Sequence, residues 1–123
     1  MKMLLVAAGG AVGSMTRYQI GAWVLARTET WAFPLGTFLV NVLGCLIAGV
    51  LIGIDEQRHF LSLELRVLVF TGFLGGFTTF SAFGVETVAL IERGAFGMAT
   101  AYVLSSVLLG LGALLAAVKL TTL

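Results

Sequence analysis

Apolar residues run through most of this chain in four long stretches separated by short polar segments. The stretches cover residues 3–26, 33–54, 67–91 and 95–118. An apolar helix needs about 20 residues to cross the hydrocarbon core of a bilayer, so each stretch is long enough for one span. The pattern predicts an all-α membrane protein, in which residues 1–123 form a single domain of four transmembrane helices.

The third stretch contains an unusual segment, GFLGGFTTFSAFGVE, over residues 72–86. Adjacent Gly75 and Gly76 are followed, after one phenylalanine, by Thr78 and Thr79, which predicts a break in the third helix. A helix in lipid must satisfy its own backbone polar groups, so a break needs a compensating partner. Two interpretations are open. The segment is a structural kink, or its freed carbonyls are satisfied by hydroxyl groups or by a cation.

Composition agrees with a membrane location. Hydrophobic residues make up 59% of the chain and charged residues 11%, against roughly 25% charged in a soluble domain. We therefore expect a multi-pass protein of the cell (inner or plasma) membrane that is surrounded by lipid. No metal-ligand cluster, nucleophile–base pair or phosphate-binding loop is visible, so we expect neither an enzyme nor a nucleic-acid-binding protein.

Basic residues are divided almost evenly between the two sides that four spans would create. One side carries Lys2, Arg58, Arg66 and Lys119. The other carries Arg27, Arg93 and, if its side chain extends to the nearer helix end, Arg17. Because an excess of Lys and Arg on one side normally fixes orientation, this weak bias permits insertion both ways. Two oppositely oriented copies could then form an antiparallel homodimer about a two-fold axis in the membrane plane.

Polar residues inside the stretches are candidates for an ion path. Arg17 either extends to the membrane surface or lines an anion vestibule. Asn41, with Thr37 one turn earlier, either bonds another helix or faces a polar path. Three further residues could continue a track of hydroxyls and a carboxylate, although ordinary interhelical hydrogen bonding gives the same pattern: Glu86, Tyr102 and Ser106.

Phe80 and Phe83 lie three residues apart just after the predicted break. Aromatic residues in membrane helices usually pack against lipid or neighbouring helices. A phenyl ring also has a positive edge, so two rings could hold a small anion weakly. Weak binding is what conduction requires.

Glycine pairs four residues apart predict close helix packing in lipid. They are Gly9 and Gly13, Gly49 and Gly53, and Gly72 and Gly76. We expect packing to explain the first two pairs. The third overlaps the predicted break.

Three motifs together make the chain resemble the Fluc family of fluoride channels, also called CrcB proteins. They are GGAVGSMTRY (residues 9–18), GTFLVNVLGC (residues 36–45) and TGFLGGFTTFSAFGVE (residues 71–86). Tyr102, Ser105 and Ser106 add a weaker match in the fourth stretch. The resemblance thus extends from the first predicted helix to the fourth.

This resemblance implies a dual-topology antiparallel homodimer with two pores that export cytoplasmic fluoride passively. Phe80 and Phe83 would offer ring edges to fluoride, Asn41 would donate its amide, and Arg17 would lie in the vestibule. The carbonyls of Gly75 and Thr78 from both subunits would hold a structural sodium ion (Na+). The polar track would contain Thr37, Ser81, Glu86, Tyr102 and Ser106. Ala82, Gly84 and Cys45 depart from hydroxyl residues common in the family, which leaves the minor pore contacts open.

Two other functions remain as alternatives. A small multidrug transporter of the four-helix, dual-topology kind needs a membrane-buried carboxylate in its first helix, whereas this chain has Arg17 there. A non-conducting membrane assembly subunit would use the break only as a packing kink. Measured ion flux distinguishes both from a channel.

Overall fold

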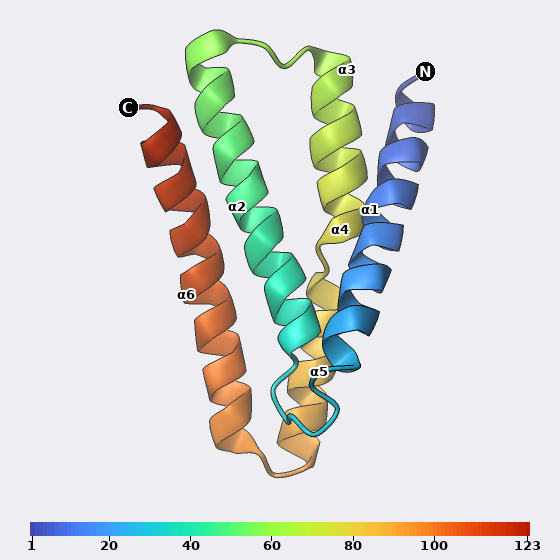
Figure 1. Cartoon of the computed structure of the whole chain (residues 1–123), viewed down its shortest axis with the longest axis vertical. Helices are drawn as coiled ribbons and strands as arrows, with labels where there is room; N and C mark the ends of the chain where they lie inside the picture. The colour runs from blue at the N-terminus through green and yellow to red at the C-terminus, as the bar shows by residue number, and fades with distance from the viewer.

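A computed structural model describes all residues 1–123, and its regular elements are all helical. In chain order they are α1 (Lys2–Leu25), α2 (Leu35–Arg58), α3 (Leu63–Arg66), the π-helix η1 (Val67–Leu74), α4 (Gly75–Phe77), α5 (Phe80–Glu92) and α6 (Phe96–Thr121). Both chain ends and the α2–α3 connection lie at one end of the molecule (Figure 1). The α1–α2 and α5–α6 connections lie at the other end. The chain therefore runs the length of the molecule and back twice.

Three helical stretches are long and apolar enough to cross a membrane, namely Leu35–Arg58, Leu63–Glu92 and Phe96–Thr121. Helix α1 has 24 residues, which corresponds to about 36 Å, but it is not in this set. Arg17 and Gln19 are strongly polar and lower its hydropathy. The protein is thus an all-helical membrane protein with three apolar helices capable of spanning.

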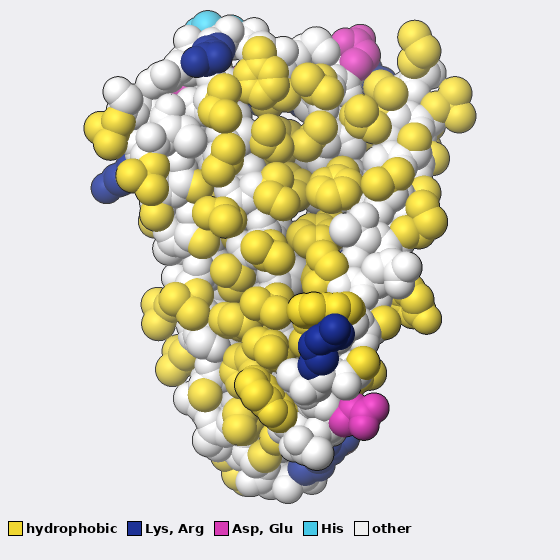
Figure 2. All heavy atoms as spheres, in the orientation of Figure 1, with side chains coloured by type: hydrophobic (Ala, Val, Ile, Leu, Met, Phe, Trp, Pro, Cys, Tyr) yellow, Lys and Arg dark blue, Asp and Glu magenta, His cyan; other side chains and the backbone are white.

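Most of the molecular surface is apolar. Only 17 of the 123 residues are buried, so most helix faces need cover from lipid or from another protein surface. Figure 2 shows hydrophobic side chains over the middle of the visible face and charged side chains mainly towards its two ends. This distribution matches an apolar membrane interior between two polar interfaces.

Glycines allow the helices to approach one another closely. Helix α1 packs against η1 and α4, and α2 packs along α6 (Figure 1). A Cβ atom added at Gly13 would overlap the backbone of η1, and one at Gly49 would overlap the backbone of α6. A Cβ atom at Gly76 would collide with the backbone of α1. The prediction of close packing is confirmed for these pairs, and the third pair also lies at a helix contact.

The helix is interrupted between α4 and α5 (Figure 1). Thr78 and Thr79 adopt extended backbone conformations, with ψ angles of 159° and 118°. Helix α5 then starts at Phe80, and the Thr79 hydroxyl caps it by accepting a hydrogen bond from the Ala82 N–H at 3.1 Å. We call Thr78 and Thr79 the break.

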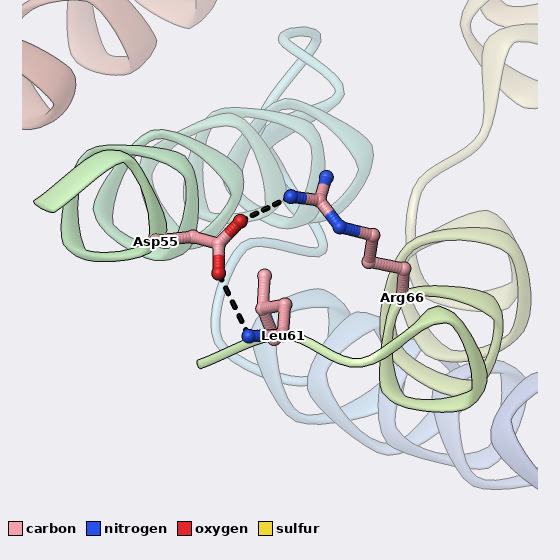
Figure 3. A network of polar contacts seen from close by, with 3 residues as sticks. All are labelled: Asp55, Leu61 and Arg66. Atoms are coloured by element: carbon pink, nitrogen blue, oxygen red, sulfur yellow. Dashed lines mark hydrogen bonds and ion pairs between the residues drawn. The ribbon is translucent and has the colours of Figure 1, made fainter. Parts of the chain in front are cut away.

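The α2–α3 connection is held by one buried carboxylate (Figure 3). Asp55, in the last turn of α2, accepts a hydrogen bond from the Leu61 N–H at 2.7 Å and forms an ion pair with Arg66 of α3. His59 ends α2 in the left-handed conformation, with φ of 48°. These contacts fix the start of the helical segment that leads to the break.

Candidate functional site

Asn41 of α2 pairs with both polar backbone groups of Thr79. Its Oδ1 accepts from the Thr79 N–H at 2.8 Å, and its Nδ2 donates to the Thr79 carbonyl at 3.0 Å. A primary amide has two N–H donors, so one remains available after this pairing. The side chain therefore bonds another helix, one of the two alternatives that the sequence left open, and also lines a cavity beside the break.

Arg17 of α1 turns towards the interior of the molecule. Its Nε donates to the Gly76 carbonyl at 2.9 Å, and the Ser14 hydroxyl lies 3.5 Å from the same oxygen. Arg17 also lines a cavity of about 470 Å³ together with Thr37 and Thr79. Arg17 thus lies between the end of α4 and this cavity, and its remaining N–H groups can face the cavity.

The carbonyls of Gly75 and Thr78 have lost their helical donors. In a continuous helix the Thr79 N–H would donate to Gly75, but here it donates to Asn41. The Ala82 N–H would donate to Thr78, but here it donates to the Thr79 hydroxyl. Gly75 is also exposed. Carbonyls freed by helix unwinding can coordinate sodium, so the chemistry of this pair fits the predicted ion.

Phe80 and Phe83 lie beside the break as the sequence spacing suggests. Their ring centroids are 5.6 Å apart and their planes are inclined by 36°. Phe80 is 84% exposed, whereas Phe83 is partly buried and its centroid lies 5.1 Å from that of Tyr102. Eight residues line a cavity of about 260 Å³ here: Asn41, Cys45, Thr78, Thr79, Phe80, Phe83, Ser106 and Val107.

Glu86 joins two hydroxyl groups from other helices. Its Oε1 accepts from the Thr37 hydroxyl and its Oε2 accepts from the Tyr102 hydroxyl, both at 2.6 Å. Tyr102 is fully buried, with 0% of its surface exposed. Three residues that are far apart in the sequence therefore form one polar cluster.

The last two predicted residues, Ser106 and Ser81, differ in their exposure. The Ser106 hydroxyl is buried without a hydrogen-bond partner and borders the cavity beside Phe83. Ser81 is exposed, with its hydroxyl 3.3 Å from that of Thr79. The structure thus gathers Asn41, Phe80, Phe83 and Ser106 around one cavity, and leaves Ser81 on the open surface.

Sequence reasoning missed two participants. Ser14 contacts the Gly76 carbonyl, and its position three residues before Arg17 places both on one helix face. Thr79 caps α5 and supplies both backbone groups that bond Asn41. A threonine three residues before the capped N–H is a recognisable helix-start pattern, so this role had a sequence signal.

Comparison with known proteins was informative over nearly the whole chain. Residues 4–118 match the family described as "CrcB-like protein, Camphor Resistance (CrcB)". A protein of Methylobacillus flagellatus named "Fluoride-specific ion channel FluC" is 50% identical over 110 residues, which cover 89% of this chain and 86% of that protein. Proteins of the same name from Rhizobium leguminosarum and Agrobacterium fabrum are 48% and 42% identical, covering 94% and 98% of this chain and 92% and 95% of theirs.

Proposed function

Because this chain belongs to the CrcB-like family, we propose that it is a fluoride-specific ion channel of the cell membrane and not an enzyme. The observation that carries the proposal is the cavity beside the break, where Asn41, Phe80 and Phe83 meet. Relatives at 42–50% identity that are named for fluoride conduction support the choice of ion. The protein is multi-pass, as its apolar helices require.

The lining of this cavity suits a small anion that must be held weakly. Fluoride is tightly hydrated, so donors must replace part of its water. The second N–H of the Asn41 amide is one such donor. The positive edges of Phe80 and Phe83 supply further weak attraction without a full charge that would trap the ion. Ser106 adds a hydroxyl with no other partner.

The channel is an antiparallel dual-topology homodimer of four-span subunits, each with a broken third helix and α1 as its first span. It contains two pores, each built from both subunits. Phe80 and Gly75 are exposed in the single chain, so both are available to a second copy. The weak Lys and Arg bias between the two ends supports insertion in both orientations.

A sodium ion at the two-fold axis is bound by the carbonyls of Gly75 and Thr78. Each chain offers these two carbonyl oxygens, and a second chain related by two-fold symmetry would offer two more to the same ion. The ion would neutralise carbonyl dipoles that the interruption leaves without donors. It would also add positive charge near an anion path.

Polar groups on either side of the cavity extend the fluoride path. Arg17 attracts anions at the vestibule, because its positive charge borders a cavity that Thr37 and Thr79 also line. The track contains Thr37, Ser81, Glu86, Tyr102 and Ser106. An inside-negative membrane potential drives an anion outwards by about 2.3 kcal/mol per 100 mV, so passive conduction exports fluoride.

Ion efflux from liposomes tests the function directly. Purified protein is reconstituted into vesicles loaded with fluoride or, in parallel, chloride, and a potassium ionophore fixes the voltage. Rapid fluoride release with chloride retained is expected. Equal release of both ions, or no fluoride release from folded protein, would contradict a fluoride-specific channel.

Ring-edge binding is tested by Phe80→Ile and Phe83→Ile, since an aliphatic side chain has no positive edge. Fluoride efflux should fall sharply in both. Phe96→Ile is a matched control, because Phe96 is also exposed, at 63%, but lies at the start of α6. Wild-type flux in the Phe80 and Phe83 variants would remove the rings from the mechanism.

Orientation is tested by labelling Gln57→Cys in a Cys45→Ser background with a membrane-impermeant thiol reagent. The reagent is added outside sealed membrane vesicles isolated from the expressing cells, not outside the reconstituted liposomes. Gln57 is exposed near the end of α2 and uncharged, so the change preserves the Lys and Arg balance. About half of the protein should react if insertion is dual. Complete or absent labelling would contradict dual topology.

The sodium site is tested by replacing sodium with a bulky organic cation during purification. Weaker dimerisation, measured by chemical cross-linking, and lower thermal stability are expected. Unchanged assembly after verified sodium depletion would exclude this site.

A further inference from the structure

Two polar side chains from different helices reach the segment from Gly75 to Thr79, which contains the break. Arg17 of α1 donates to the Gly76 carbonyl at 2.9 Å. Asn41 of α2 accepts from and donates to Thr79, at 2.8 and 3.0 Å. No other side chain outside this helical segment bonds its backbone between Gly75 and Thr79, apart from the weaker Ser14 contact at 3.5 Å.

These bonds satisfy two of the five carbonyls from Gly75 to Thr79. Gly75 and Thr78 are without their helical donors, while the carbonyls of Gly76 and Thr79 are each taken by a side chain. Asn41 also causes the loss at Gly75, because it captures the Thr79 N–H that a continuous helix would direct there. The Asn41 side chain of α2 thus frees the Gly75 carbonyl, whereas the Thr79 hydroxyl frees the Thr78 carbonyl by capturing the Ala82 N–H.

We propose that Asn41 and Arg17 are positioning residues that hold the break open and so present its freed carbonyls, among them those of Gly75 and Thr78, to the cation. The role in cation binding rests on the proposed function. The role of both side chains in holding the backbone rests only on the hydrogen bonds described above. Asn41 then has two roles, since its pairing with Thr79 also fixes the direction of its remaining N–H donor towards the fluoride cavity.

The close approach of both helices makes this arrangement specific. A Cβ atom at Gly44, three residues after Asn41, would overlap the Thr78 methyl group, so α2 meets the break without an intervening side chain. On the other side, a Cβ atom at Gly13 would overlap the segment just before it. Asn41 and Arg17 can therefore reach the backbone within hydrogen-bonding distance.

The physical need for the two residues follows from the membrane environment. An extended pair of residues within a lipid-embedded helix exposes backbone groups that water would otherwise satisfy. The Asn41 amide replaces both missing partners of Thr79 at once, because it carries an acceptor and a donor at the correct separation. No hydrophobic side chain of similar size can do this.

Amide hydrogen exchange, measured residue by residue by NMR, tests the holding of the backbone. In the wild-type protein the Thr79 N–H should be protected equally with sodium present and depleted, because its partner is Asn41 and not the cation. Asn41→Ala should raise its exchange rate about tenfold, the loss expected for one hydrogen bond. Phe80→Ile, which lines the same cavity without contacting the Thr79 backbone through its side chain, should change the rate less than twofold.

Two exchange results would overturn the proposal. One is an unprotected Thr79 N–H in folded wild-type protein, a measurement that does not depend on any variant folding. The other is an unchanged exchange rate of the Thr79 N–H in an Asn41→Ala variant that is shown to be folded by its elution in size-exclusion chromatography.

Presentation of the carbonyls to the cation is tested by titrating sodium into depleted protein and following thermal stability. Asn41→Ala and Arg17→Gln should raise the half-saturating sodium concentration about tenfold, whereas Phe80→Ile should leave it unchanged while lowering flux. An unchanged sodium requirement in both Asn41→Ala and Arg17→Gln would refute this role. If wild-type protein shows no sodium response at all, the sodium site fails, and the exchange result at Thr79 still decides whether Asn41 holds the break.

Discussion

Loss of the hydrogen bond between Tyr102 and Glu86 should lower the free energy of unfolding substantially. Tyr102→Phe removes the hydroxyl that donates to Glu86 Oε2 at 2.6 Å and leaves the ring in place. A hydrogen bond to a charged group contributes about 1.5 to 3 kcal/mol. Tyr102 is fully buried, which favours the upper part of this range, but Glu86 borders a cavity of about 320 Å³ that water can enter. We therefore expect a loss of about 2 kcal/mol in the free energy of unfolding.

The assay is reversible unfolding in mixed detergent micelles, with a rising fraction of denaturing detergent. A loss of about 2 kcal/mol corresponds to a change of about 30-fold in the unfolding equilibrium constant. The chain contains a matched control, because its other tyrosine, Tyr18, is 75% exposed and donates no hydrogen bond. Tyr18→Phe should alter the free energy by less than about 0.5 kcal/mol.

A double-mutant cycle isolates the contact from other effects of the change. In a Glu86→Ala background the hydroxyl of Tyr102 has no carboxylate partner, so Tyr102→Phe should then cost close to nothing. Equal effects of Tyr102→Phe and Tyr18→Phe, or an unchanged effect of Tyr102→Phe in the Glu86→Ala background, would refute the reasoning.

Two further predictions concern helix packing and the α2–α3 connection. Gly13→Ala should destabilise the fold by about 1 to 3 kcal/mol in the same assay, because its Cβ overlaps the backbone of η1, whereas Gly84→Ala meets nothing within 4 Å and should be tolerated. Asp55→Asn removes the ion pair with Arg66, which is 55% exposed, so we expect a loss of about 1 to 2 kcal/mol. Glu56→Gln, at an exposed neighbouring position, should show little change, and equal effects within either pair would contradict the assigned contacts.

Much of the architecture could be predicted from local sequence. Apolar length predicts the long helices, because burial in hydrocarbon requires a minimum number of apolar residues. The run from Gly75 to Thr79 indicates an interruption, since glycine and threonine weaken a helix at that place. Small-residue spacing at Gly9 and Gly13 indicates close packing. These properties depend on residues that are neighbours in the chain.

The partners of the polar side chains depended on the tertiary structure. From the sequence, Asn41 could bond any helix or none, and only the approach of α2 to the break places its amide on Thr79, 38 residues away. Arg17 similarly reaches Gly76 across 59 residues. Glu86 could be assigned to a polar track, but its simultaneous bonds to Thr37 and Tyr102 require three helices to meet.

The sequence by itself therefore determined that this is a helical membrane protein, and it predicted where a helix would be interrupted and which residue types would surround the interruption. The tertiary structure decided which backbone groups those residues satisfy and which they leave free. The physical reason is that apolar length and helix breaking act within a few residues. Hydrogen bonds between helices depend instead on how closely whole helices pack, and glycines such as Gly44 permit the approach that brings Asn41 to the break.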